Sequence, residues 1–152
     1  STDKSIEIIN NSMKGNFKII KQEKNRGAAI SRDVGINNAK GRFVCFLDAD
    51  DLWKTNKLEM QINFMISNNY GFTFTDYEYA DIDGIGKGKT TNIPKVMKYK
   101  DALKNTTIFT STVMIDTNLI NKEDIYMPDV DYEDTACWWS ILKKYEYAYG
   151  LK

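Results

Sequence analysis

Three aspartates within four positions are the residues best placed to do chemistry. Asp48, Asp50 and Asp51 directly follow an apolar run over residues 43–47. Such a run is typical of a buried strand, and open α/β sheets bind ligands at the carboxyl ends of their strands. Carboxylates this close repel one another unless a cation offsets them, and Mg²⁺ and Mn²⁺ prefer such oxygen ligands. The pattern predicts a divalent-metal site that holds a phosphorylated ligand. The alternative is a turn in which Asp48 caps the next helix.

Two more polar groups are candidates for a site. Arg32 precedes the carboxylates in the chain, and its planar guanidinium could grip a diphosphate or a base, or it could lie on a solvated helix face. Glu133 and Asp134 precede an apolar helix that contains Trp138. The helix dipole alone favours acidic residues there, and a carboxylate at the edge of a cleft can also act as a general base. Both alternatives stay open for each group.

The absence of histidine excludes several kinds of site. The chain has no histidine and two cysteines, Cys45 and Cys137. Serine–histidine and cysteine–histidine nucleophile pairs are therefore impossible within it, as are zinc sites of histidine or of four cysteines. We expect both thiols to be buried and free, and a disulfide between them is the alternative. Acid–base chemistry must use Asp, Glu, Lys, Tyr or Cys.

Length and charge narrow the function classes further. The 152 residues predict a single domain over 1–152. Lys and Arg number 21, as do Asp and Glu, so the zero net charge gives no argument for nucleic-acid binding. The longest apolar runs are too short for a transmembrane helix. Because the first residues are polar, we expect no signal peptide.

Hydrophobic periodicity predicts an alternation of helices and strands, which favours a parallel, doubly wound α/β sheet. Helices are expected from near Ser1 or Thr2 to 13 and over 28–39, 52–68, 101–105 and 133–144. Strands are expected over 17–22, 43–47, 72–75, 109–115 and 147–151, with a hairpin or surface loop over 81–92. A sheet of this kind normally begins with a strand, so either the fold is unusual or its first strand is missing here.

An ordered set of motifs resembles glycosyltransferase family 2. The motifs are Asn25-Arg26-Gly27, Ser31-Arg32-Asp33-Val34-Gly35, Gly41-Arg42-Phe43, Phe46-Leu47-Asp48-Ala49-Asp50-Asp51 and Glu133-Asp134 with Trp138. The resemblance covers nearly the whole chain. It implies the GT-A fold, an α/β nucleotide-sugar domain with a mostly parallel doubly wound sheet, whose first βαβ portion is missing here.

The resemblance also implies roles for individual residues. Asp48 and Asp50 match the DXD motif: Asp50 would ligate Mn²⁺ or Mg²⁺ bridging the diphosphate, and Asp48 would contact the ribose or the metal. Asp134 would be the catalytic base. The other nucleotide-sugar-binding residues would be Arg32, Gly27, Ser111 and Glu133.

The implied activity is inverting, metal-dependent transfer of a sugar. The donor would be a nucleotide-diphosphate sugar and the acceptor a glycan or a lipid-linked acceptor, in the cytoplasm or at the inner face of the membrane. Bacterial surface polysaccharide synthesis is the expected setting, with peripheral membrane association and self-association through exposed strand edges as further expectations. Two alternatives stay open: a haloacid-dehalogenase-like phosphatase, which Leu47-Asp48-Ala49-Asp50 also resembles, and a non-catalytic interaction module.

Overall fold

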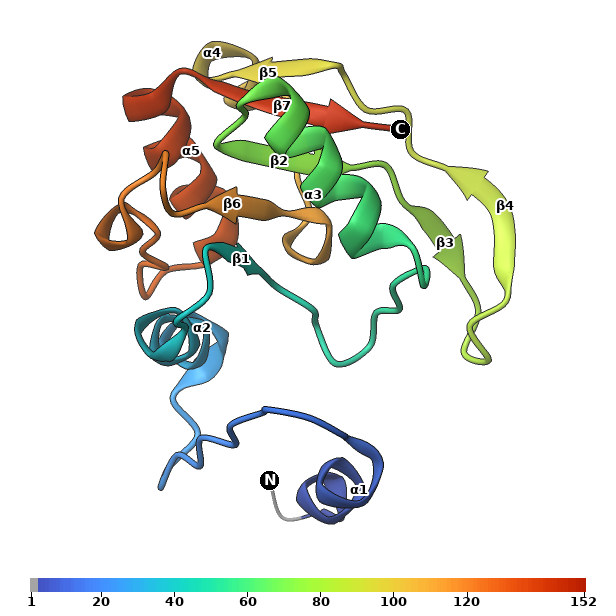
Figure 1. The fold of residues 1–152 in the computed structure, drawn as a ribbon. Coiled ribbons are helices and arrows are strands. Elements are labelled where there is room, and N and C mark those ends of the chain that lie inside the picture. Colours follow the sequence, from blue (N-terminus) through green and yellow to red (C-terminus); the bar gives the residue numbers. More distant parts are fainter. Residues whose placement is uncertain (1–2) are drawn as a thin grey trace.

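A five-stranded sheet in the order β1-β6-β2-β7-β5 organises the chain (Figure 1). The computed structural model describes residues 3–152, so the expected helix cap at Ser1 or Thr2 lies outside the described residues. The strands of the main sheet are β1 (Phe43–Cys45), β2 (Phe72–Thr75), β5 (Val96–Lys98), β6 (Met114–Asp116) and β7 (Tyr147–Leu151). A separate hairpin of β3 (Glu78–Ala80) and β4 (Gly86–Thr90) confirms the hairpin alternative for the 81–92 segment.

The main sheet is mixed, and the expectation of a mostly parallel sheet was wrong. Strand β6 lies antiparallel between β1 and β2, and β5 is antiparallel to β7. Among the described residues, β2 and β7 form the one parallel pair. The reason is the route of the chain, which enters β6 from the end of the sheet where β1 and β2 finish. Strands β1, β2 and β7 still run in one direction, so their carboxyl ends share one edge.

Five helices and two 3₁₀ turns complete the described chain. They are α1 (Ser5–Ser12), α2 (Gly27–Asn38), α3 (Lys57–Asn68), α4 (Tyr99–Ala102), η1 (Thr110–Thr112), η2 (Lys122–Asp124) and α5 (Glu133–Tyr145). Helices α2 and α5 confirm the predicted 28–39 and 133–144 helices closely. Helix α3 begins five residues later than expected, and α4 ends before its predicted range does. No helix of residues 3–152 is long and apolar enough to cross a membrane.

Two predicted strands do not form as expected. Residues 17–22 are predicted as a strand but make none, because no neighbouring strand among the described residues offers them a ladder of hydrogen bonds. The strand predicted over 109–115 forms only in its last part, as β6. Its first part forms η1 instead, because hydroxyl groups there make hydrogen bonds to nearby residues. The Thr112 hydroxyl donates to the Phe109 carbonyl at 2.6 Å, a pattern that competes with sheet pairing.

Helix α5 is fixed to the sheet by a buried aromatic cluster. Trp138 is fully buried, and its ring centroid lies 5.7 Å from that of Phe46 and 5.6 Å from that of Phe72. Burying side chains of this size stabilises a fold by about 1.5–3 kcal/mol each. The cluster therefore sets where α5 begins relative to the strand ends. In contrast, α1 buries none of its residues and lies apart from the sheet (Figure 1).

Candidate functional site

The carboxylate loop, residues 48–52, follows β1 and is anchored by one serine. The backbone N–H of Asp48 donates to the Ser111 hydroxyl at 3.0 Å. The indole N–H of Trp53, just after the loop, donates to the Ser111 carbonyl at 2.7 Å. Ser111 is itself buried in η1. The predicted site residue Ser111 therefore lies against the loop and holds both of its ends.

Arg32 joins the carboxylate loop to the start of α5. Its guanidinium donates to Asp48 Oδ1 at 2.7 Å and, through its other terminal nitrogen, to Glu133 Oε1. Burial on its own lowers the pKa of Arg32, but the hydrogen bond and charge of Asp48, with the charges of Glu133 and Asp134, outweigh burial and raise that pKa. Arg32 therefore stays charged at any working pH, and it brings together carboxylates that are 85 positions apart in the sequence (133 minus 48).

Asp134 is held in one orientation by two donors. The Thr110 hydroxyl donates to Asp134 Oδ2 at 2.7 Å, and the backbone N–H of Thr135 donates to Oδ1 at 2.6 Å. Thr110 is only 4% exposed, so its hydroxyl cannot easily turn to solvent. Asp134 also lies in the first turn of α5, where the helix dipole favours negative charge. A carboxylate fixed in this way is suited to accept a proton from a positioned hydroxyl group.

Two predicted residues make no contact with this ion-paired group. Gly27 begins α2 with a φ of +83°, a conformation that glycine adopts easily, and it lies five positions before Arg32. Its N–H donates to the Asn25 side chain at 3.0 Å. Gly27 thus starts the helix that carries Arg32, and the structure shows no contact between it and the carboxylates. Asp50 is exposed on the loop, and within residues 3–152 its side chain makes no hydrogen bond or ion pair.

The donor set is compatible with a divalent ion shared with a phosphorylated ligand. No group of three or more His, Cys, Asp or Glu side chains in the described chain could enclose a metal. Mg²⁺, however, is commonly bound by one or two carboxylates together with substrate phosphates and water. Asp50 offers two unengaged oxygens, while Arg32 occupies only Oδ1 of Asp48. These oxygens fit a hard cation that a diphosphate helps to hold.

Three residues of the site were missed by sequence reasoning: Thr110, Trp53 and Lys57. A threonine in a Ser/Thr-rich stretch and a tryptophan after an acidic loop carry no pattern that names their partners. Lys57, the first residue of α3, places its ammonium group 4.1 Å from the centre of the Trp53 ring. Its Nζ is buried with no hydrogen-bond partner among the described residues, and burial lowers its pKa to about 8. This contact braces the tryptophan that anchors the loop.

Replacing Lys57 with methionine is expected to stabilise the fold near neutral pH, because it removes a buried ammonium without a hydrogen bond. The folded-state pKa lies below the ordinary value of 10.5, so between about pH 8 and 10.5 the unfolded chain binds more protons. Wild-type stability should therefore rise with pH through this window, relative to the variant. Urea unfolding at pH 7 and pH 9.5 measures the difference. Lys143→Met, at an exposed position of α5, is the matched control; equal pH dependence in both variants would contradict the role given to Lys57.

The arrangement of elements is that of the GT-A fold. The crystal structure of S. aureus TarS matches 99% of this chain with a TM-score of 0.69 and 21% sequence identity, and the match covers 46% of the TarS chain. The structure of TarS in complex with UDP-GlcNAc matches with a TM-score of 0.68. At 21% sequence identity, this structural similarity establishes the fold alone.

The sequence comparisons identify the family. The profile of glycosyl transferase family 2 matches residues 1–127, and this chain belongs to that family. TuaG of Bacillus subtilis (strain 168), a glycosyltransferase provisionally assigned to teichuronic acid biosynthesis, is 42% identical over 134 residues, 88% of this chain and 52% of its own length. The Escherichia coli UDP-Glc:alpha-D-GlcNAc-diphosphoundecaprenol beta-1,3-glucosyltransferase WfgD is 41% identical over 127 residues, 84% of this chain and 49% of its own. The chain thus spans about half the length of these relatives.

Proposed function

We propose that this chain carries out inverting, metal-dependent transfer of a sugar from a nucleotide-diphosphate donor to a glycan or lipid-linked acceptor. The observation that carries the proposal is the Arg32 bridge, which unites the carboxylate loop with the start of α5, where Asp134 lies. Family membership favours this function over the phosphatase and the non-catalytic module, because the segment that matches the family, residues 1–127, contains the carboxylate loop.

The donor end of the site is the carboxylate loop. Asp50, with Asp48, would hold Mn²⁺ or Mg²⁺ against the diphosphate, and such an ion neutralises charge on a departing nucleoside diphosphate. Ser111 fixes the loop through its hydroxyl and carbonyl groups. Arg32 holds Asp48 in place and adds positive charge beside the position proposed for the diphosphate.

The acceptor end is Asp134. One carboxylate oxygen of Asp134 accepts the proton of the acceptor hydroxyl while the oxygen of that hydroxyl forms a bond to the anomeric carbon. The bond between the anomeric carbon and the diphosphate oxygen breaks in the same displacement, and the nucleoside diphosphate leaves with the electron pair. Attack from the opposite face inverts the anomeric configuration. The Thr110 hydrogen bond keeps the carboxylate aimed during this step.

The names of similar proteins narrow the substrates we propose. WfgD and WfaP of E. coli are named for transfer from UDP-Glc to GlcNAc-diphosphoundecaprenol, and TarS has been solved with UDP and UDP-GlcNAc. We therefore propose a UDP-sugar donor and a polyprenyl-diphosphate-linked acceptor in bacterial surface polysaccharide synthesis. We propose that the transfer takes place at the inner face of the membrane, because such an acceptor is anchored in the lipid bilayer.

UDP together with Mn²⁺ is expected to stabilise the chain against unfolding. A ligand that binds only the folded state at 100 times its Kd adds about 2.7 kcal/mol. Calorimetry and thermal unfolding with UDP, GDP and ADP, each with and without Mn²⁺, measure binding and base preference. Asp50→Asn should remove the Mn²⁺-dependent part, while Asp83→Asn, at an exposed turn between β3 and β4, should not. Equal stabilisation in the Asp50→Asn variant would overturn the metal-ligand role of Asp50, and no binding of any nucleotide would count against a donor site in this chain.

A further inference from the structure

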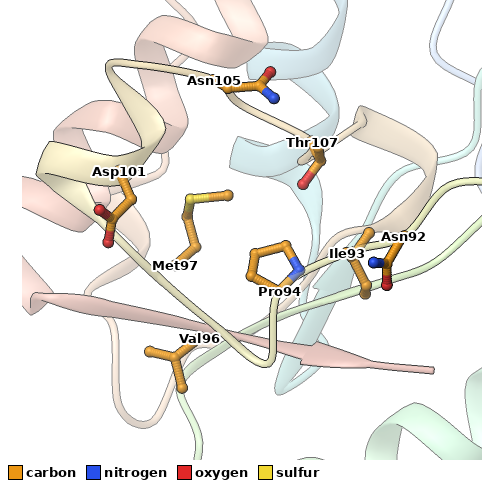
Figure 2. A pocket seen from close by; sticks show the side chains of 8 residues that line it. All are labelled: Asn92, Ile93, Pro94, Val96, Met97, Asp101, Asn105 and Thr107. Carbon is orange, nitrogen blue, oxygen red and sulfur yellow. The ribbon is translucent and has the colours of Figure 1, made fainter.

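A cavity, the α4 pocket, lies on another part of the fold from the carboxylate loop. Its volume is about 520 Å³, within the range of small-molecule sites. Figure 2 shows its lining, which comes from the segment entering β5, from β5 itself, from α4 and from the segment that leads to η1. The lining residues are Asn92, Ile93, Pro94, Val96, Met97, Asp101, Asn105 and Thr107.

The lining favours an uncharged, hydroxyl-rich ligand. Half of the lining residues are apolar and half carry hydrogen-bonding side chains, while none is Lys or Arg. A phosphate would find no cation in the lining and would meet the carboxylate of Asp101. In Figure 2, Asp101 and Thr107 stand on opposite sides of the pocket, with Met97 and Pro94 between them. A sugar ring can place one face on such apolar groups while its hydroxyls reach the polar groups at the rim.

Thr107 gives the pocket a buried polar group that lacks a partner. Its hydroxyl oxygen is buried and makes no hydrogen bond within the described residues. A buried polar group left without a hydrogen bond is unfavourable, so a ligand hydroxyl that reaches this oxygen would gain affinity by bonding to it.

One wall of the pocket is rigid. The N–H of Gly150 in β7 donates to the Lys95 carbonyl at 2.9 Å, beside Pro94. A Cβ at Gly150 would lie 2.2 Å from the Pro94 carbonyl oxygen, so this close approach of the two backbones requires glycine. The wall is therefore formed before any ligand arrives, which lowers the ordering cost of binding.

A short stretch of chain connects the α4 pocket to Thr110, the hydrogen-bond partner of the proposed base. Thr107 lines the pocket, and Thr110, three residues later, donates to Asp134. Three residues span at most about 11 Å even when fully extended. A sugar unit in the pocket can thus belong to the same molecule as a hydroxyl that reaches Asp134.

We propose that the α4 pocket binds a neutral sugar unit of the acceptor. The assignment of that sugar to the acceptor rests on the transferase function proposed above, whereas the binding of a sugar in the pocket does not. The Asp101 carboxylate accepts hydrogen bonds from its hydroxyls, the Thr107 hydroxyl can donate to or accept from them, and Met97 and Pro94 pack against its ring.

The test is a titration of the ¹⁵N-labelled chain followed by NMR amide shifts. The probes are the methyl glycosides of glucose, galactose, mannose and N-acetylglucosamine, with inorganic phosphate as the anionic comparison. At least one glycoside should shift the amides of Asn92, Met97 and Asn105, and phosphate should leave them unchanged. Asp101→Asn and Thr107→Val should each weaken that binding about three- to tenfold. Asp83→Asn and Thr90→Val, exposed positions in the β3–β4 hairpin, are the matched controls and should bind as the wild type does.

The outcomes separate this inference from the proposed function. If no glycoside shifts the pocket amides, or if the pocket variants bind like their controls, the pocket inference is overturned. A parallel titration with UDP and Mn²⁺ reports on residues 48–53 instead. If UDP binds and no glycoside does, the inference about the pocket is overturned, and the proposed donor site is still supported. If a glycoside binds and UDP does not, the pocket is supported as a sugar site, and the proposed donor site is contradicted. The same spectra show whether each variant is folded.

Discussion

Asp134→Asn is expected to lower the rate constant of sugar transfer, kcat, by about 10²–10⁴-fold, the usual contribution of a general base. Asparagine keeps the size of the side chain and can still bond to Thr110 and to the N–H of Thr135, since its amide offers both a donor and an acceptor. It cannot take up a proton. Initial rates with saturating donor and acceptor measure the loss, and UDP affinity by calorimetry should change by less than about twofold because Asp134 lies at the acceptor end.

A graded series tests whether the orientation of Asp134 matters as well as its charge. Thr110→Val removes the hydroxyl that donates to Asp134 Oδ2, and it should lower kcat about tenfold. Thr110→Ser keeps the hydroxyl and should retain most of the rate. Asp131→Asn, an exposed aspartate just before α5, is the matched control for charge. If Asp134→Asn kept its rate within threefold of the wild type, another group would have to accept the proton.

The carboxylate loop and the start of α5 could be predicted because their signals are local. An apolar run that stops at Asp48 and Asp50, and acidic residues before the apolar Trp138 helix, are short patterns set by burial and by the helix dipole. Their meeting could not be predicted in the same way. Arg32 and Glu133 are 101 positions apart, and their contact depends on how Trp138 seats α5 against the sheet.

The wrong strand predictions have a similar physical origin, because they too depend on partners that a local pattern does not show. Residues 17–22 contain enough apolar residues to suggest a strand, yet a strand exists only where a neighbour pairs with it. The 109–115 segment contains β-branched residues that favour a strand. The Thr110 hydroxyl donates to Asp134 instead, and the Thr112 hydroxyl donates to the nearby Phe109 carbonyl. Gln61 shows most plainly what a local pattern cannot predict. This polar residue of α3 is fully buried, and its side-chain amide donates to the Thr73 hydroxyl and to the Thr112 carbonyl, each at 3.0 Å. Partners so distant in the sequence leave no periodic pattern.

Arg32→Met is expected to lower the free energy of unfolding by about 1–3 kcal/mol. Breaking a fully buried ion pair costs about 3–5 kcal/mol, because the remaining charge is left without a partner. The cost here is smaller because Asp48 is 36% exposed and water reaches it, whereas Glu133 is only 19% exposed. Urea unfolding at pH 7 measures the loss, which corresponds to a decrease in Tm of about 2–4 °C per kcal/mol for a chain of this size.

A second substitution, added to Arg32→Met, shows which carboxylate costs more stability when its charge is left without a partner. Glu133→Gln in the Arg32→Met background should recover more stability than Asp48→Asn does, since Glu133 is the less exposed partner. The double-mutant cycle isolates each pair from the effect of shortening the arginine. Arg26→Met, at an exposed position just before α2, controls for the loss of a positive charge. Equal stabilities for Arg32→Met and Arg26→Met would mean that the bridge does not hold the loop to α5. In that case the distance between the carboxylate loop and Asp134 would have to be set by the Ser111 and Trp138 contacts alone.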